Sequence, residues 1–207
     1  MNLENIYWLG HASFRIEDRD RQIYIDPWKL SSGLPKADFI FITHDHYDHY
    51  SAKDIALIKK DETVIIGTLD VAEKHPSEVV GVKPGEIRTV NGLTFSTEPA
   101  YNLNKSFHPK ANGWVGYKIE LSTRLKVYHT GDTDFIPEMK NVQTDILMLP
   151  IGGTYTMTAV EAAQACEAIQ PKGIIPMHWG DIVGSADDVE VLKQHTKLPI
   201  YIKQPHK

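Results

Sequence analysis

The sequence predicts an α/β protein built as a four-layer αββα sandwich, with two β-sheets between outer layers of helices. Short runs rich in Ile, Val, Tyr and Phe recur along the chain between Gly, Pro, Asn or Asp, a pattern typical of strands. Runs in the first half and the middle follow one another closely, whereas later runs alternate with helical segments. With 207 residues and 42% hydrophobic content, the chain can bury one substantial core, so we expect a single domain over residues 1–207.

The expected strands are short, mostly four to seven residues, and begin close to the amino terminus. They cover residues 6–9, 13–17, 22–25, 38–42, 63–66, 79–82, 86–90, 93–97, 114–120, 125–129, 146–149, 173–176 and 200–202. Asn91 and Gly92 stand between two of these runs, and both residue types tolerate positive φ. We therefore expect a tight hairpin at this point.

Three helices are indicated by capping residues in front of apolar patterns. Ser51 precedes a segment with apolar residues at 55, 57 and 58, and Thr158 with Glu161 forms a T-x-x-E capping box before an alanine-rich stretch. Ser185 or Asp187 begins the last helix. A shorter helix is expected near residues 70–74.

Composition excludes several functional classes. The net charge is −5, the pI is near 6.0 and no Lys/Arg cluster is present, so no nucleic-acid partner is expected. No apolar run approaches the roughly 18 residues of a membrane span, and no signal peptide is recognisable at the start. The single cysteine, Cys166, suits a reducing cytoplasm and a small buried apolar role. A small-molecule substrate is the expected partner, and the sequence does not specify an oligomeric state.

The densest group of polar side chains follows the strand expected at 38–42. Within six residues the chain carries three imidazoles and two carboxylates, those of His44, Asp45, His46, Asp48 and His49. Imidazole nitrogen and carboxylate oxygen are ligands of zinc, iron and manganese. In an extended turn His44 and His46 point the same way, while Asp48 and His49 reach an adjacent position. The segment predicts a metal centre with one ion at each pair.

This H-x-H-x-D-H segment resembles the defining motif of the metallo-β-lactamase superfamily. The resemblance covers most of the chain, through GHASF at 10–14, IDP at 25–27, TGDTD at 130–134 and MHW at 177–179. These motifs look like the small subgroup of metal-dependent hydrolases that includes the ascorbate-phosphate lactonase type. The resemblance implies the metallo-β-lactamase fold and one or two zinc ions, with manganese or iron as alternatives.

The resemblance also implies ligands beyond this segment. Asp132 matches the carboxylate that bridges two metals, and His178 matches the last histidine ligand of the second metal. The superfamily normally supplies a third histidine to the first metal, but the matching strand end carries Tyr101. His108, seven residues further on, is the expected substitute ligand or a substrate contact, with a surface-loop histidine as the alternative. A mononuclear centre is the consequence if His108 does not reach the metal.

Three residues are expected to take part in catalysis. Asp48 is expected to orient the attacking water as well as to bind metal. His11, in a turn that approaches the metal centre in the resembling subgroup, either orients a ligand or substrate or has a structural role. Tyr101 either lines the site with its hydroxyl or packs in the core. Asp26 is expected to hydrogen-bond a ligating imidazole.

The expected function is metal-dependent hydrolysis of a small ester, lactone or phosphoester by a metal-activated water. Lactone or phosphodiester hydrolysis is the first choice, and it rests on the subgroup resemblance. An iron-dependent redox enzyme on the same fold is one alternative. A metal-bound sensor or interaction module without turnover is another, and it requires a closed coordination shell.

Overall fold

Two six-stranded mixed sheets, one in each of two units of the chain, organise the computed structural model. The structure describes residues 3–75 and 77–206. The first unit comprises Met1–Val82 with Lys203–Lys207, and the second comprises Lys83–Ile202. A single domain over residues 1–207 stays a prediction.

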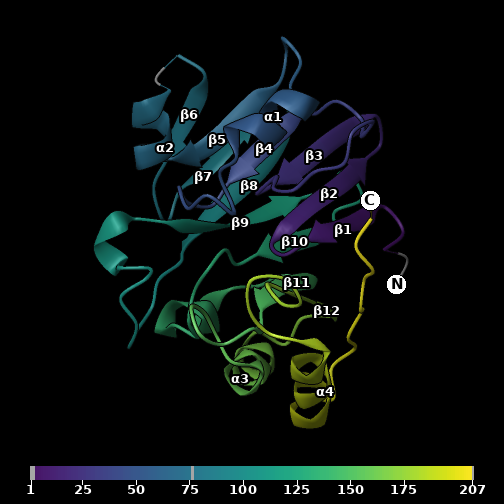
Figure 1. Cartoon of the computed structure of the whole chain (residues 1–207), viewed down its shortest axis with the longest axis vertical. Coiled ribbons are helices and arrows are strands. Elements are labelled where there is room, and N and C mark those ends of the chain that lie inside the picture. Colours follow the sequence, from purple (N-terminus) through teal and green to yellow (C-terminus); the bar gives the residue numbers. More distant parts are fainter. Residues whose placement is uncertain (1–2, 76, 207) are drawn as a thin grey trace. The chain divides into compact units, whose positions relative to one another are not determined.

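The strands of the first unit stand in the sheet in the order of the sequence. They are β1 (Ile6–Gly10), β2 (Ser13–Asp18), β3 (Arg21–Ile25), β4 (Phe39–Ile42), β5 (Val64–Thr68) and β6 (Val79–Val82) (Figure 1). The first three pair antiparallel, and β3 to β6 pair parallel. The carboxyl ends of β3, β4 and β5 therefore lie at the same edge of this sheet, which is where polar residues begin.

Two helices connect the parallel strands of this sheet, α1 (Ala52–Ile58) and α2 (Leu69–Lys74). The predicted cap of α1 is confirmed, because the Ser51 side chain accepts a hydrogen bond from the backbone N–H of Asp54. Ile55 and Ile58 pack with alternate residues of the central strands, including Tyr24 and Ile40. This apolar contact fixes the position at which the chain leaves β4 and enters the helix.

The second sheet repeats the pattern of antiparallel strands followed by parallel strands. Its order is β12-β11-β10-β9-β8-β7, with β7 (Ile87–Val90), β8 (Leu93–Pro99), β9 (Val115–Glu120), β10 (Lys126–His129), β11 (Ile146–Pro150) and β12 (Gly173–Met177). The predicted hairpin is confirmed between β7 and β8, where Asn91 and Gly92 have φ of 46° and 76°. Two short 3-10 helices, η1 (Lys110–Asn112) and η2 (Pro137–Asn141), lie in the connections.

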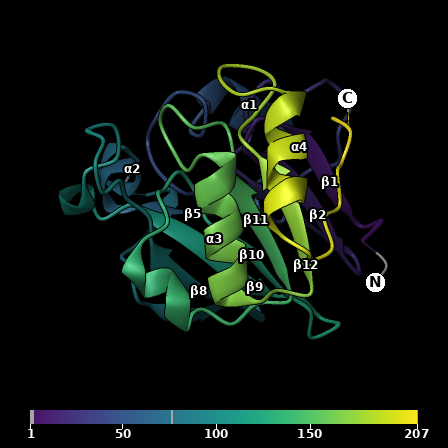
Figure 2. The same ribbon diagram turned by 90° about the horizontal axis from the view of Figure 1, so that it is seen from below.

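The helices α3 (Ala159–Ile169) and α4 (Ala186–His195) lie side by side in the second unit (Figure 2). The predicted capping box of Thr158 and Glu161 is confirmed, and Ser185 caps α4. Ala162, Ala165 and other small residues of α3 share one apolar cluster with residues of β10, β11 and β12. Small side chains allow the helix to approach the sheet closely.

The strand expected at 200–202 is wrong. Ile200 makes an isolated bridge to Ile174 of β12, and no strand extends from it among the described residues. The physical reason is that this segment pairs with the edge strand β12 at one residue only, and a single pair does not make a strand. The backbone of 203–206 belongs instead to the first unit, where the N–H of His206 donates to the carbonyl of Trp8 at 2.7 Å.

Cys166 lies on the buried side of α3 and is 0% exposed. Burial raises the pKa of its thiol to about 12, so the thiolate that reacts with disulfide reagents is scarce in the folded protein. We expect native protein to react with DTNB at about pH 8 only as fast as it unfolds, and denatured protein to react rapidly. Fast stoichiometric labelling of the native chain would contradict the burial of this helix face.

Candidate metal centre

Two histidines beyond β4 bring their ring nitrogens together. His44 Nε2 lies 3.1 Å from His46 Nδ1, with His44 buried and His46 half-buried. A tetrahedral zinc ion with zinc–nitrogen bonds of about 2.0–2.1 Å separates two such ligand atoms by about 3.3 Å. The spacing of His44 and His46 therefore fits two ligands of one ion.

The chain turns sharply after His46 and presents a second pair of donor atoms. The backbone N–H of His49 donates to the carbonyl of His46 at 3.0 Å, which closes the turn. Asp48 and His49 are buried by it, and His49 Nε2 lies 3.8 Å from Asp48 Oδ2. Tyr47, between the two pairs, points away and is 69% exposed.

The Asp26 carboxylate, fully buried beyond β3, orients two of these imidazoles. Its Oδ2 lies 2.7 Å from His49 Nδ1 and accepts the Thr43 hydroxyl at 2.6 Å. Because that hydroxyl donates to Asp26, its oxygen accepts from His44 Nδ1, 2.9 Å away. Both imidazoles then carry their proton on Nδ1 and present Nε2 as the ligand atom. The hydrogen bond predicted from Asp26 to a histidine of the motif is present.

His11 reaches the motif through Asp48. Its Nε2 lies 3.0 Å from Asp48 Oδ2, and its ring makes an edge contact with Trp28. His11 and Asp26 adopt φ of 50° and 47°, a left-handed conformation that costs a non-glycine residue about 1–3 kcal/mol. Backbone held in this conformation at two positions beside the motif is typical of a functional site.

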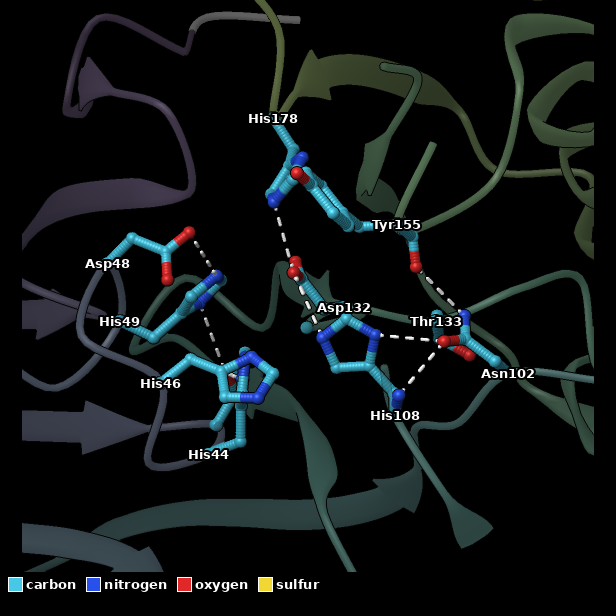
Figure 3. Close-up of polar contacts among 12 residues, drawn as sticks. His44, His46, Asp48, His49, Asn102, His108, Asp132, Thr133, Tyr155 and His178 are labelled. Carbon is cyan, nitrogen blue, oxygen red and sulfur yellow. Dashed lines mark hydrogen bonds and ion pairs between the residues drawn. The ribbon is translucent and has the colours of Figure 1, made fainter. Parts of the chain in front are cut away.

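In the second unit, one carboxylate oxygen faces two imidazoles. Asp132 Oδ2, beyond β10, lies 3.0 Å from His178 Nε2 and 3.3 Å from His108 Nε2 (Figure 3). All three residues are almost completely buried. A carboxylate shared by two histidines from separate loops can serve two ions, and the structure brings together the three residues that sequence analysis assigned to this role.

His178 directly follows β12 and has φ of 58°, again in the left-handed region. A Cβ atom at Gly152 would lie 2.3 Å from the carbonyl oxygen of His178, so only glycine permits this approach of the two loops. Gly152 therefore belongs to the support of the site, although sequence analysis gave it no such role.

The loop after β8 turns His108 toward Asp132 and directs the Tyr101 hydroxyl elsewhere. That hydroxyl lies 2.9 Å from Glu138 Oε2, and Lys110 Nζ donates to it at 3.2 Å. Burial, together with the Glu138 hydrogen bond, raises the pKa of the Tyr101 phenol, which keeps the hydroxyl a neutral donor. The contacts of Tyr101 give no support to the catalytic role expected for it.

Three residues near the ligands had no assigned role in the sequence analysis: Thr43, Asn102 and Asp134. Thr43 is adjacent to the first histidine and Asp134 lies within the TGDTD motif, so their positions were a usable signal. Asn102 follows a strand end, as do Asp26 and His178, but a single amide there is a weak signal. Thr43 contacts His44, Asn102 contacts His108, and Asp134 contacts Asn102, and these contacts appear only in the folded chain.

The donor atoms in each unit fit a divalent transition metal. The first unit offers imidazole nitrogens of His44, His46 and His49 with a carboxylate of Asp48, and the second offers two imidazoles around Asp132. Mixed nitrogen and oxygen ligands suit zinc, manganese and iron. Buried carboxylates and imidazoles at these distances are the environment in which a divalent cation replaces the lost hydration.

Replacing Asp26 by Asn tests the orientation of His49. An amide N–H facing His49 Nδ1 disfavours the proton on that nitrogen, so we expect zinc affinity to fall about 10–100-fold. Competition titration with a chromophoric chelator measures this change. Asp38→Asn, at a half-buried carboxylate just before β4 that pairs with Lys60, is the control and is expected to bind zinc as wild type. Unchanged affinity in Asp26→Asn would remove Asp26 from the support of the site.

Comparison with known proteins agrees with the motifs. Residues 5–178 match the family model described as Beta-lactamase superfamily domain. A UPF0173 metal-dependent hydrolase from Caldivirga maquilingensis is 31% identical over 221 residues, with 96% of this chain and 94% of that protein covered. A solved structure of a candidate metal-dependent hydrolase from Parabacteroides distasonis is 32% identical with a TM-score of 0.88, with 97% and 93% covered.

The fold itself recurs at much lower identity. A metallo-beta-lactamase fold protein from Bacillus subtilis is 12% identical with a TM-score of 0.75, and 98% of this chain and 97% of that chain are covered. The predicted α/β fold of the metallo-β-lactamase type is therefore confirmed.

Proposed function

The chain belongs to the beta-lactamase superfamily and, within it, to the UPF0173 metal-dependent hydrolases, and from this premise we propose that it hydrolyses a small ester, lactone or phosphoester. One observation carries the proposal. The Asp132 carboxylate lies within 3.3 Å of the Nε2 atoms of two histidines, in the manner of a carboxylate that serves two ions. Lactone or phosphodiester hydrolysis is the first choice among these reactions.

We propose that the ligand sets of the two units serve one dinuclear centre, with zinc as the first metal to test and manganese or iron as alternatives. Asp132 with two histidines offers each ion too few ligands for a four-coordinate site. The remaining donors are those of the H-x-H-x-D-H motif. The proposed first ion takes His44, His46 and His108, the second takes Asp48, His49 and His178, and Asp132 is shared.

When bound, the ions lower the pKa of a water toward about 7 and polarise the oxygen that gains charge. The side chains of this protein hold and move the proton. Asp48, which also binds metal, orients the attacking water through its carboxylate and can accept its proton. His11 Nε2, 3.0 Å from Asp48 Oδ2, holds that carboxylate in place and can pass the proton toward the leaving group.

A small-molecule substrate is the proposed partner. The net charge of −5 and the absence of a basic cluster from the sequence disfavour nucleic acid. No helix within residues 3–75 and 77–206 is long and apolar enough to cross a bilayer. A cytoplasmic location stays a proposal, supported by the single cysteine.

Metal content per chain, measured by elemental analysis on protein purified without added metal, tests the centre. We expect about two ions in wild type and about one in either His108→Ala or His178→Ala. His195→Ala, at an exposed histidine of α4, is the matched control and keeps the wild-type content. The same analysis identifies the metal.

Turnover is then measured on aryl esters, lactones and bis(nitrophenyl) phosphate. Asp132→Ala is expected to lose both metal and hydrolysis, because each ion loses the shared carboxylate. Full metal content together with full turnover in Asp132→Ala would contradict the proposed centre. A wild-type chain without metal, even after reconstitution, would overturn the proposed function.

Tyr101→Phe separates the two roles expected for this residue. The hydroxyl contacts Glu138 and Lys110, and a surface network of this kind contributes about 0–1 kcal/mol to stability. We expect kcat and KM on the best substrate of the panel to stay within about 2-fold of wild type, since general acid catalysis contributes about 100-fold or more. A loss of about 100-fold in kcat at unchanged metal content would restore Tyr101 as a catalytic residue.

A further inference from the structure

One side chain, that of Asn102, contacts His108 at two atoms. Asn102 Oδ1 accepts the backbone N–H of His108 at 2.9 Å and lies 3.1 Å from His108 Nδ1. The backbone N–H of Asn102 donates to the carbonyl of His108 at 2.8 Å, so the two residues close the loop between them. Figure 3 shows the Asn102 amide in contact with the imidazole on the side opposite Asp132.

The orientation of the Asn102 amide follows from its other contacts. Its Nδ2 donates to Asp134 Oδ1 at 3.0 Å and to the carbonyl oxygen of Tyr155 at 2.9 Å. A carboxylate and a carbonyl only accept hydrogen bonds, so the amide NH₂ must face them and the amide oxygen must face His108. The Asn102 oxygen therefore favours the proton of His108 on Nδ1 and leaves Nε2, 3.3 Å from Asp132 Oδ2, as the ligand atom for a cation.

The Asp134 carboxylate orients Asn102 by accepting a hydrogen bond from its amide nitrogen. Asp134 is 3% exposed, and besides Asn102 it accepts the backbone N–H of Leu103 at 2.8 Å and Lys105 Nζ at 2.6 Å. The carboxylate accepts all three of these bonds, one of them from the Lys105 ammonium. The hydrogen bonds therefore run from His108 Nδ1 to Asn102 Oδ1 and from Asn102 Nδ2 to Asp134 Oδ1, with the donor and the acceptor of each determined by the amide.

We propose that Asn102 and Asp134 are positioning residues that select the Nδ1-protonated form of His108 and aim its Nε2 at the metal. The inference rests on the proposed function for the presence of the metal. Which nitrogen of His108 carries the proton is measurable in the metal-free chain, where Asn102 Oδ1 and Asp132 Oδ2 face its two nitrogens as acceptors.

The test compares Asn102→Leu with the exchange variant Asn102→Asp/Asp134→Asn. Leucine has a similar size but makes none of the hydrogen bonds that the Asn102 side chain makes with His108, Asp134 and Tyr155. In the exchange variant the carboxylate at 102 accepts from His108 Nδ1 and the amide at 134 donates to it, so the acceptor for the imidazole is kept, whereas the hydrogen bond to the carbonyl of Tyr155 is lost. Asn112→Ala, at an exposed asparagine of η1, is the control.

Two measurements are made on each protein. NMR of isotope-labelled histidine in metal-free protein, at alkaline pH where a free imidazole is neutral, reports which nitrogen of His108 carries the proton. Zinc binding is measured by competition with a chelator. We expect Asn102→Leu to lose the single form of His108 and to bind one zinc ion about 10–100-fold more weakly. The exchange variant is expected to recover both properties, and Asn112→Ala to match wild type.

The outcomes separate this inference from the proposed function. Wild-type His108 protonated on Nε2, or Asn102→Leu with wild-type spectrum and zinc affinity, would overturn the inference and leave the metal centre standing. A wild-type chain that binds no zinc or other divalent metal would overturn the proposed function, while the spectrum of His108 would still decide its selected form.

Discussion

The Asp26 carboxylate is the contact on which the metal-binding segment of the first unit depends. It is fully buried, and it accepts from the backbone of Thr43, from the Thr43 hydroxyl and from His49. These bonds are possible because β3 and β4 pair parallel, with Ile25 opposite Phe41, so the residues beyond both strands meet at one sheet edge. A shift in this register would separate the carboxylate from the imidazoles it orients.

In the second unit, different groups orient a histidine. Here the Asn102 amide oxygen contacts the imidazole of His108, and the Asp134 carboxylate accepts a hydrogen bond from the Asn102 amide nitrogen. In both units a side chain beyond a strand end determines which ring nitrogen of a histidine carries the proton. Rigid strands on one side and buried hydrogen bonds on the other leave the proposed ligand atoms little freedom, which is what a preorganised metal site requires.

The site is maintained against local strain. His11, Asp26 and His178 all adopt the left-handed conformation, at about 1–3 kcal/mol each. The apolar residues of the strands next to the site, such as Ile40 and Phe41 of β4 and Ile175 of β12, are buried and stabilise the framework that holds these residues. Strain located beside chemically important groups, and balanced by a well-packed core, agrees with a hydrolytic site rather than a surface loop.

The sequence by itself determined the positions of the strands from β1 to β12 to within two residues, the capping of three helices, the hairpin at Asn91 and the order of the histidines and carboxylates. These features are local, because they depend on residue type and short spacing along the chain.

The sequence did not determine which residue after β8 faces Asp132, nor the roles of Asn102 and Gly152. Those depend on contacts between residues distant in sequence, such as the bond from Asn102 to Tyr155, 53 positions away. The segment 200–202 has the composition of a strand, but the tertiary structure allows it only one bridge to β12. Local pattern selects the element and the ligand types, whereas packing of distant loops decides which side chains meet.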